Sequence, residues 1–365
     1  MKFRCDRDSL VEALSTAGRA ASTRGGATPT LSGVKLDLAS GTLALTGTDL
    51  DLTISTTLSV DGIADGTSVL PSRLIVDIVK SLESGAIELE VSDEEAHISA
   101  GRAQFAVRAL PATEFPRPPE PPARQVSLDA AALGEALRQV VSAASTDESR
   151  PILTGVLLAA EGTGLRLVAT DSYRLAVRDL PGTSVLEADQ QVLVPAAALR
   201  ELNRLLSGAS EVVVRIGERH ATFEVGAVHL TTRLIEGEFP NYRGLIPASH
   251  PNRLTVGRDA LLDGVKRVKL LAKEATPVRL AMAAESLELI TINQDLGQAH
   301  EQIDAKYEGS DLTVAFNPDY LMAGIEVCPG DEVTLESVDS LKPAVLRSVE
   351  REDFLYLLMP VRVTA

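Results

Sequence analysis

The sequence predicts an α+β protein made of three tandem copies of one domain, each with two helices packed on antiparallel sheets. Three observations lead to this prediction. A strand followed by an amphipathic helix opens each copy, one type of hairpin recurs, and the distance between two landmarks is repeated. That distance is 112 residues from Phe3 to Phe115 and 113 residues from Val126 to Phe239. Self-similarity over such a length indicates a repeated structural unit.

The first element of each copy is a short strand that leads into a helix. Apolar residues follow the first strand position at offsets of 7 and 11 in all three copies, which is the spacing of one helical face. An aspartate stands near each helix start, where a carboxylate favours the free N–H groups. The apolar residues are Phe3, Leu10 and Leu14, then Val126, Leu133 and Leu137, then Leu254, Leu261 and Val265; the aspartates are Asp8, Asp129 and Asp259.

A hairpin with an unusual tip comes next. Residues 165–177 alternate apolar and polar side chains, with a break at 170–172. Such alternation is typical of half-buried strands, and an Asp-Ser pair between two such runs is typical of a turn. Residues 43–54 repeat the pattern, and the third copy has a similar strand at 287–292 with a turn after it.

A second helix follows in each copy, with a proline in its expected first turn, where the missing N–H is harmless. These prolines are Pro71, Pro195 and Pro318. Paired strands then complete the copy. The predicted helices cover residues 8–20, 72–84, 129–143, 196–207, 258–273 and 317–327. The predicted paired strands are 87–91 with 97–110, 212–216 with 221–234, and 333–335 with 345–363.

Two proline-rich segments, 116–122 and 247–251, mark the boundaries between copies. Segments of this composition are stiff and extended, so they space domains. We therefore predict domains over residues 1–123, 124–250 and 251–365.

The composition fits a multidomain protein with aliphatic cores. The chain has 365 residues, 45% of them hydrophobic, and no tryptophan. Its net charge of −16 would ordinarily argue against a nucleic-acid partner. Cys5 and Cys328 lie in apolar segments, so we expect buried free thiols and a reducing, cytoplasmic location. The first residues lack the apolar core of a signal peptide, and no run is long enough to span a membrane, so we expect neither export nor membrane insertion.

The charges are distributed unevenly. The predicted helices contain as many basic as acidic residues, so the strands and loops carry the whole carboxylate excess. One helix is basic, with Arg258, Lys266, Arg267, Lys269 and Lys273. A solvated helix face is the commoner interpretation of such a pattern. The alternative is a helix-lined surface that tolerates phosphates without gripping them.

Seven motifs, in order along the whole chain, carry a family resemblance. They are Met1-Lys2-Phe3, Leu45-Thr46-Gly47-Thr48-Asp49, Arg150-Pro151-Ile152-Leu153-Thr154-Gly155, Ala169-Thr170-Asp171-Ser172-Tyr173-Arg174-Leu175, Glu238-Phe239-Pro240-Asn241-Tyr242, Phe316-Asn317-Pro318-Asp319-Tyr320 and Leu358-Met359-Pro360-Val361-Arg362. With these motifs the chain closely resembles the bacterial DNA polymerase III β subunits, the sliding clamps. The resemblance implies three DNA-clamp domains and a head-to-tail homodimeric ring whose helices line a hole around double-stranded DNA.

The resemblance also implies partners and sites. The clamp tethers the DNA polymerase III α subunit and docks the clamp loader, other polymerases and repair proteins through short motifs. The implied peptide pocket comprises Leu153, Thr170, Ser172, Tyr173, Arg174, Leu175, Pro240, Leu245, Asn317, Tyr320, Leu341, Pro343, Met359, Pro360, Val361 and Arg362. The implied DNA contacts are Arg24 and Arg73, and ring closure would pair Phe105 and Val107 with Leu270 and Leu271 of the other chain.

The sequence departs from some family members at a few positions. Gly244 stands beside the implied pocket where an arginine can occur, and Ala275 lies near where an aromatic residue can occur. Pro151 and Ile152 replace aromatic residues that touch DNA in some members.

An enzyme is the alternative class, for example a hydrolase built on repeated α+β units. The 170–173 segment contains a serine, yet no histidine is close in sequence and no Gly-x-Ser-x-Gly elbow is present. The five histidines are scattered without metal-ligand spacing. Gly25-Gly26 lacks the Gly-Lys-Ser/Thr of a phosphate loop. No acid, base and nucleophile converge, which argues against the hydrolase. The family resemblance implies neither catalysis nor a cofactor, so we predict a non-catalytic protein, and we expect no metal site.

Overall fold

The computed structural model describes residues 1–22, 28–92, 94–273 and 276–363 of the 365-residue chain. Contacts within the chain divide it into two compact units. The first unit comprises Met1–Ala131 and Glu201–Leu234, and the second comprises Ala132–Arg200 and Ile235–Ala365.

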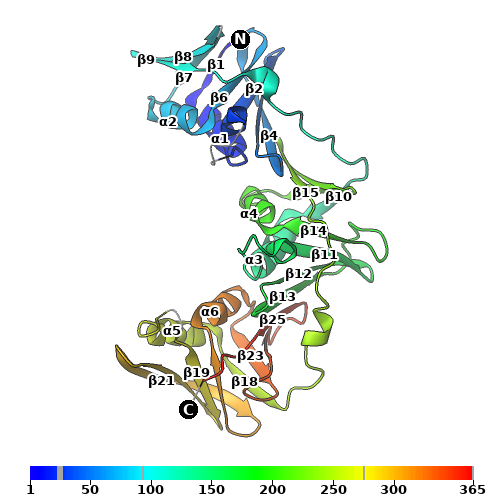
Figure 1. Ribbon diagram of the computed structural model, residues 1–365, viewed down its shortest axis with the longest axis vertical. Helices are drawn as coiled ribbons and strands as arrows, with labels where there is room; N and C mark the ends of the chain where they lie inside the picture. Colours follow the sequence, from blue (N-terminus) through cyan, green and yellow to red (C-terminus); the bar gives the residue numbers. More distant parts are fainter. Residues whose placement is uncertain (23–27, 93, 274–275, 364–365) are drawn as a thin grey trace. The chain divides into compact units, whose positions relative to one another are not determined.

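Six α-helices occur in the described residues, one for each predicted window. They are α1 Arg7–Gly18, α2 Ser72–Ser81, α3 Ala130–Val141, α4 Ala196–Leu205, α5 Arg258–Lys269 and α6 Pro318–Val327. Figure 1 shows α1 beside α2 in the first unit and α5 beside α6 in the second, and both pairs are in contact. The predicted pairing of two helices is therefore confirmed in these two repeats.

Five of the six helices end two to four residues before the predicted end. The cause is visible after α1 and α5, where the chain tightens from α-helical to i−3 hydrogen bonding. The N–H of Ala20 donates to the Ala17 carbonyl at 3.2 Å, and the N–H of Ala272 donates to the Lys269 carbonyl at 2.8 Å. Such turns provide donors for the last carbonyl groups of a helix, which have no intrahelical partner. Their apolar residues continue the helical spacing in the sequence, so the predicted helix is too long.

The helix starts differ in detail from the prediction. Asp8 lies in the first turn of α1, as predicted, and Asp6 caps the helix by accepting the N–H of Ser9 at 2.9 Å. Pro318 is the first residue of α6, as predicted. Pro71 and Pro195 instead end the preceding strands, directly before α2 and α4. Proline fits there as well, because the first N–H groups of a helix have no intrahelical acceptor.

The described residues form 25 strands. Those of the first unit are β1 Lys2–Asp6, β2 Gly33–Ala39, β3 Thr42–Thr48, β4 Leu52–Ser59, β5 Asp61–Ala64, β6 Gly66–Pro71, β7 Ala86–Ser92, β8 Glu95–Ala100, β9 Ala103–Arg108, β10 Val126–Asp129, β15 Glu211–Ile216, β16 His220–Val225 and β17 Val228–Arg233. Those of the second unit are β11 Gly155–Glu161, β12 Gly164–Thr170, β13 Arg174–Leu180, β14 Gln191–Pro195, β18 Asn252–Gly257, β19 Val278–Ala283, β20 Ser286–Asn293, β21 Gly297–Glu308, β22 Leu312–Phe316, β23 Glu332–Ser337, β24 Ala344–Ser348 and β25 Phe354–Leu358.

The longer partner of each predicted strand pair is itself a hairpin. Residues 97–110 contain most of β8 and all of β9, residues 221–234 most of β16 and all of β17, and residues 345–363 most of β24 and all of β25. Gly101 and Gly226 turn the first two hairpins, with φ of 55° and 57°. Glycine adopts this left-handed conformation without the strain that a Cβ would cause.

The sheets continue from one repeat into the next. The first unit has a sheet in the order β5-β1-β7-β8-β9 and an eight-stranded sheet, β10-β15-β16-β17-β4-β3-β2-β6. The second unit has one sheet of twelve strands, β14-β11-β12-β13-β25-β24-β23-β18-β21-β20-β19-β22. In these sheets β17 of the second repeat pairs with β4 of the first, and β25 of the third pairs with β13 of the second.

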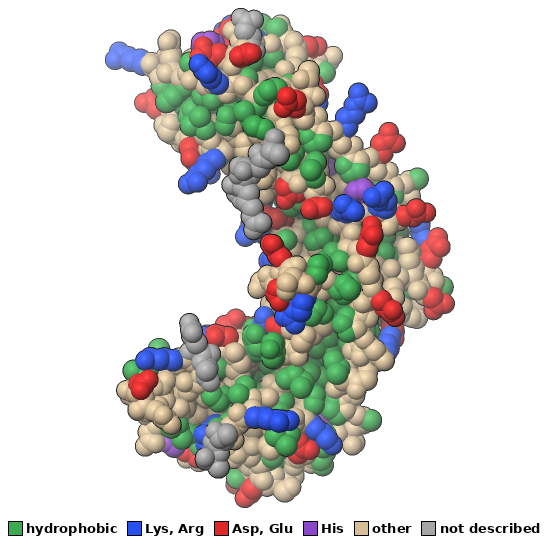
Figure 2. All heavy atoms as spheres, viewed as in Figure 1, with side chains coloured by type: hydrophobic (Ala, Val, Ile, Leu, Met, Phe, Trp, Pro, Cys, Tyr) green, Lys and Arg blue, Asp and Glu red, His purple; other side chains and the backbone are tan. Residues whose placement is uncertain are grey.

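Charged side chains of both signs are interspersed on the face shown in Figure 2. The five predicted cations on and after α5 each have a carboxylate within 4.0 Å. The pairs are Arg258–Asp259, Lys266–Asp263, Arg267–Glu301, Lys269–Asp319 and Lys273–Asp295. This pairing agrees with the solvated-face interpretation of the basic helix.

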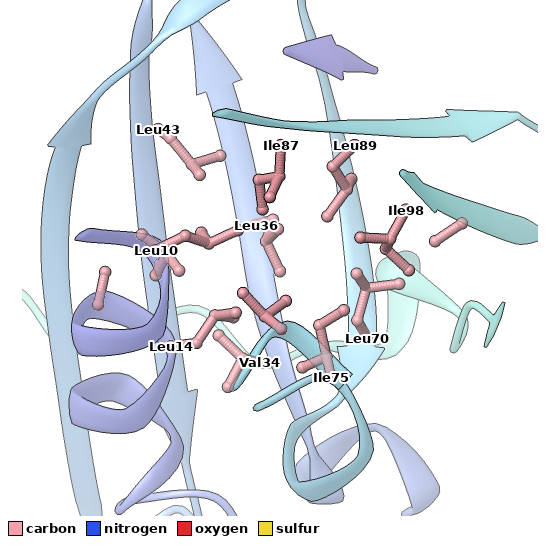
Figure 3. Packing of buried hydrophobic residues seen from close by; sticks show 14 of the residues in the cluster. Leu10, Leu14, Val34, Leu36, Leu43, Leu70, Ile75, Ile87, Leu89 and Ile98 are labelled. Carbon is pink, nitrogen blue, oxygen red and sulfur yellow. The ribbon is translucent and has the colours of Figure 1, made fainter. Parts of the chain in front are cut away.

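The core of the first repeat is mainly aliphatic around its helix pair, and Phe3 adds a buried aromatic ring. Figure 3 shows Leu10 and Leu14 of α1 and Ile75 of α2 pointing toward strand residues such as Leu36 and Leu89. All five of these side chains are completely buried. The i, i+4 spacing seen in the sequence therefore marks the helical face that packs on the sheets.

Both cysteines are free, and Cys328 is buried while Cys5 is partly buried. Burial raises the pKa of each thiol to about 12. In the part of the chain that the structure describes, none of the helices has the length and apolar character needed to cross a membrane.

Candidate functional site

The tip of the β12–β13 hairpin is organised by Asp171, whose side chain is largely buried. Its Oδ1 accepts the N–H groups of Tyr173 and Arg174 at 2.9 and 3.0 Å, and its Oδ2 accepts Nε of Arg174 at 3.0 Å. Thr170 Oγ1 donates to the Arg174 carbonyl at 2.7 Å. Ser172 takes a φ of 79°, which this closed turn imposes. The tip is thus fixed by its own hydrogen bonds.

The other two repeats use the same turn. Asp49 Oδ1 accepts the N–H groups of Asp51 and Leu52 at 3.0 and 2.7 Å. Asn293 Oδ1 accepts those of Asp295 and Leu296 at 3.0 and 3.1 Å. A side-chain oxygen that accepts from the backbone two and three residues later is an Asx turn. The primary role of Asp171 is therefore structural.

Through Tyr173 and Arg174 the hairpin tip contacts the third repeat. The rings of Tyr173 and Tyr320 stack with centroids 6.3 Å apart, and the Arg174 guanidinium lies 4.5 Å from the Tyr320 centroid. Arg174 also donates to the Tyr356 hydroxyl at 3.3 Å, which in turn donates to the Tyr320 carbonyl at 3.2 Å. Burial raises the pKa of Tyr356 to about 12, so the phenol stays protonated as a donor. Tyr173 remains 58% exposed.

Residues 359–363, here called the closing segment, run along one side of this tip. The N–H of Met359 donates to the Tyr173 carbonyl at 2.9 Å, and the N–H of Val361 donates to the Ala315 carbonyl at 2.7 Å. Ala315 belongs to β22, the last strand of the twelve-stranded sheet. The closing segment therefore covers a sheet edge while it borders the hairpin tip.

The apolar residues of the predicted peptide pocket fall into two groups. Leu153 and Leu175 are 9% and 1% exposed, so they belong to the floor and the core rather than to an open wall. Leu175 packs in a buried cluster with Phe239 and Tyr242. Large apolar side chains that remain exposed are Tyr173, Leu245, Leu341 and Met359.

Several polar residues of the predicted peptide pocket already form hydrogen bonds within the chain. Asn317 caps α6, and its Oδ1 accepts the N–H groups of Asp319 and Tyr320 at 2.8 and 3.3 Å. Thr170 is buried and bonded within the turn, whereas Ser172 is exposed and accepts from Arg150 at 3.3 Å. Pro240 and Arg362 are exposed, and Pro343, Pro360 and Val361 are half-buried.

Leu341 of the predicted pocket and the closing segment also border a cavity. Its volume is 450 Å³, and its lining includes Leu341, Val361 and Arg362. The structure thus brings together the hairpin tip, the closing segment and Leu341. Sequence reasoning missed Tyr356 and Arg150: Tyr356 stands in an apolar run typical of a buried strand, and Arg150 was noted only as part of a motif.

The positions that depart from the family pattern lie around this site. A Cβ added at Gly244 would meet nothing within 4 Å, so a longer side chain would have room there. Pro151 and Ile152 begin the 3₁₀ helix η3, Pro151–Thr154, and Pro151 is exposed. Ala275 lies outside the described residues.

The candidate DNA contacts can be placed only in part. Arg73 is exposed on α2 and lines a groove of about 930 Å³ together with Arg19 and Lys80. The groove also borders α1, so it follows the helix pair of the first repeat. Arg24 lies outside the described residues.

The candidate ring-closing residues differ in exposure. Phe105 and Val107 lie on β9, the edge of the five-stranded sheet, and are 37% and 5% exposed. Leu270 follows α5 and is 82% exposed, while Leu271 is half-buried. Among the described residues, no group of three or more His, Cys, Asp or Glu side chains is arranged to hold a metal ion.

Comparison with known proteins places this architecture in a family. Family models for the DNA polymerase III beta subunit match residues 1–119 with the N-terminal domain, 127–241 with the central domain and 243–362 with the C-terminal domain. The beta sliding clamps of Streptomyces coelicolor and Synechococcus elongatus are 32% and 34% identical to the chain, each aligned over 100% of both sequences.

Solved structures agree with the sequence comparison. The DNA polymerase sliding clamp of Bacillus subtilis has a TM-score of 0.93 at 31% identity, with 100% of both chains covered. A sliding clamp of Bartonella birtlesii, solved bound to griselimycin, has a TM-score of 0.95 at 32% identity over 100% of both chains. With three tandem clamp domains matched along its length, the chain belongs to the DNA polymerase III beta subunit family of sliding clamps.

Proposed function

We propose that this chain, a DNA sliding clamp that tethers the replicative polymerase, works as a head-to-tail homodimer closed around duplex DNA. In this role it is a processivity factor without catalytic activity, and it acts in the bacterial cytoplasm. The proposed domains are residues 1–123, 124–250 and 251–365. Their number is supported by the three family matches, which cover residues 1–119, 127–241 and 243–362. The observation that carries the proposal is a junction between repeats that occurs twice within the chain.

At each internal junction, the strand after the hairpin tip pairs with the last strand of the next repeat. Leu52 of β4 lies opposite Thr232 of β17, and Arg174 of β13 lies opposite Leu358 of β25. Beside these pairs, the N–H of Arg233 donates to the Asp51 carbonyl at 2.8 Å. The N–H of Met359 makes the equivalent bond to Tyr173 at 2.9 Å. The two junctions therefore share one geometry.

The equivalent strand of the third repeat is β21, and in the described residues no strand of a further repeat pairs with it. Along residues 297–304, β21 pairs with β20, and its pairing with β18 begins only at Ala305. The described residues thus leave one edge of this stretch unpaired. The first repeat has a matching edge in β9, since β9 pairs only with β8 in its sheet. An unpaired strand edge is a template for pairing with another chain.

We therefore propose that β21 of one chain pairs with β9 of the other. A two-fold axis uses this unlike contact twice and closes a ring of two chains. The exposed Leu270 and the half-buried Leu271 would contact the same partner domain. Light scattering at micromolar concentration tests the proposal: twice the chain mass of 38.7 kDa is expected. A stable monomer at that concentration would contradict it.

The peptide site is proposed around the hairpin tip. Tyr173, Leu245, Leu341 and Met359 offer exposed apolar surface, and Arg174 and Arg362 supply polar groups nearby. This mixture suits a short unfolded segment with leucine and phenylalanine anchors. Each buried anchor contributes roughly 1.5–3 kcal/mol, so affinity near the micromolar range is expected for one peptide. The polymerase III α subunit, the clamp loader and repair proteins are the proposed donors of such segments.

Fluorescence anisotropy with a labelled Gln-Leu-Ser-Leu-Phe peptide tests this site. Ending the chain at Leu358 removes Met359 and its bond to Tyr173, so peptide binding should be lost while the dimer persists. Leu50→Ala is a matched control, because Leu50 is a 62% exposed tip residue of the first repeat. Unchanged peptide affinity in the shortened chain would overturn the assignment.

For DNA we propose contacts from Arg24 and Arg73. The groove that contains Arg73 also presents Arg19 and Lys80, which supports a phosphate-facing role for this helix pair. The net charge of −16 keeps such contacts weak, so closure of the ring rather than affinity would hold the protein on DNA.

A further inference from the structure

Arg279 of β19 differs from the other partly buried arginines. The described residues include nine arginines that are buried or half-buried, and eight of them form an ion pair with a carboxylate. No carboxylate of the described residues lies within ion-pair distance of Arg279. An unpaired guanidinium in a partly buried site loses hydration without compensation, so it is expected to have a ligand.

Two cavities meet at Arg279. The smaller has a volume of 450 Å³ and the larger about 1010 Å³, and both are lined by Arg279 and by residues 361–363 of the closing segment. The smaller cavity adds the hydroxyls of Thr313 and Ser340. The larger adds Lys273, whose ammonium lies 4.0 Å from the Asp295 carboxylate. Guanidinium and hydroxyl donors are the groups that recognise an anion.

The smaller cavity is continuous with the proposed peptide site. Leu341 borders both, as do Val361 and Arg362. A peptide whose apolar anchors lie against Tyr173, Leu341 and Met359 therefore has its flanking residues within reach of Arg279. The cavity is also too polar on the Arg279 side to favour another apolar anchor.

We propose that Arg279 binds a carboxylate of an acidic residue that flanks the apolar motif of a partner peptide. This inference rests on the proposed peptide site and specifies its ligand further. The direction in which acidic residues change the peptide affinity tests this inference. A chain of net charge −16 repels acidic peptides as a whole, so tighter binding of an acidic peptide requires a local cation.

The test compares labelled peptides by fluorescence anisotropy with the full chain at low ionic strength. One carries Gln-Leu-Ser-Leu-Phe between serine pairs, and two others replace the N-terminal or the C-terminal serine pair with aspartates. One acidic peptide should bind about tenfold more tightly than the neutral peptide, as expected for a charge-assisted hydrogen bond in a partly buried site. Added salt should reduce the difference.

Substitutions at Arg279 locate the effect. Arg279→Gln should abolish the acidic preference and leave the affinity for the neutral peptide unchanged. Arg279→Lys should retain part of the preference, because it keeps the charge but loses the bidentate geometry. Lys306→Gln is the control, since it removes one exposed cation from β21 of the same repeat.

The outcomes separate this inference from the proposed function. If the neutral peptide binds but neither acidic peptide gains affinity, the Arg279 inference is wrong and the peptide site stands. If Lys306→Gln reduces the preference as much as Arg279→Gln does, the effect is one of net charge and the inference is again wrong. If no peptide binds at all, the proposed peptide site itself fails.

Discussion

At the scale of single residues, three hairpin tips depend on one acceptor oxygen each. Asp49, Asp171 and Asn293 occupy the same position in the three repeats and accept equivalent backbone N–H groups. Asp171 has one further role, because its second oxygen holds Arg174 against Tyr320. Comparison of the three repeats therefore distinguishes two functions of this side chain. Either an amide or a carboxylate can make the turn, but only a carboxylate can also form an ion pair with the arginine.

This separation predicts graded effects of substitution at Asp171. Asp171→Ala leaves two backbone donors and a largely buried guanidinium without their acceptor, which should cost about 2–4 kcal/mol of unfolding free energy. Asp171→Asn keeps the turn acceptor, as Asn293 does, and should cost clearly less. Urea unfolding measures both. Equal destabilisation by the two substitutions would show that the turn acceptor is not what matters.

The thiols give a second prediction at this scale. Because burial raises the pKa of Cys5 and Cys328 to about 12, almost no thiolate exists in the folded protein at pH 8. Ellman's reagent should therefore react slowly with the folded chain and rapidly with two thiols once the chain is unfolded. Fast reaction of a full equivalent in native buffer would contradict the assigned burial.

The sequence could predict the turn at 170–172 but not the contacts that give it a role. Asp-Ser chemistry is local, so it is visible in a short window. The contact between Arg174 and Tyr356 joins residues 182 positions apart, and it depends on the pairing of β13 with β25. Likewise, Leu175 looks like any apolar strand residue in sequence, and only packing shows that it belongs to the core.

At the scale of elements, the helices were the more predictable part. Their periodicity and caps are local properties, and each of the six windows contains a helix. The sheets required long-range information, because strands of adjacent repeats pair with each other. The closing segment shows the same limit: residues 359–363 fall within the predicted strand 345–363, yet β25 ends at Leu358 and Val361 instead bonds to the edge strand β22.

The repeated junction predicts a register for the contact between chains. Arg108 ends β9, the last strand of the first repeat, and lies opposite Glu95, the first residue of β8. Arg233 ends β17, the last strand of the second repeat, and in the same way lies opposite His220, the first residue of β16. Arg233 donates to Asp51, two residues after the turn residue Asp49, so Arg108 should donate to Asp295. In that register Gln104 of one chain lies opposite Ala299 of the other.

Cysteine pairs test this register. Directly opposed strand residues lie close enough for a disulfide, whereas a shift of two residues places them too far apart. Gln104→Cys combined with Ala299→Cys should therefore give a covalent dimer on oxidation, seen on a non-reducing gel. Ala106→Cys with Ala299→Cys is the shifted control. Crosslinking of the control pair alone would show that the register is wrong.

At the scale of the whole molecule, charge and topology have to be weighed together. The chain has 51 acidic and 35 basic residues, and the cations at α5 are paired with carboxylates. Broad release of counterions from DNA cannot then supply tight binding, since it needs many unpaired cations on one surface. We therefore expect a clamp of this composition to hold DNA by enclosure rather than by affinity, which would let it slide.

The last prediction separates enclosure from affinity. Protein loaded onto a circular plasmid should stay bound in moderate salt, because leaving requires the ring to open. Cutting the plasmid once should release the protein by sliding off the ends, without any change in solution conditions. Gel filtration before and after cutting measures the bound fraction. Arg73→Ala should weaken binding to linear duplex and lower the yield of loading, yet leave retention on the circle intact, because Arg73 contributes contact and not closure. A protein that remains on the linear plasmid, or an Arg73→Ala variant that leaves the closed circle, would show that phosphate contacts rather than a closed ring hold it on DNA.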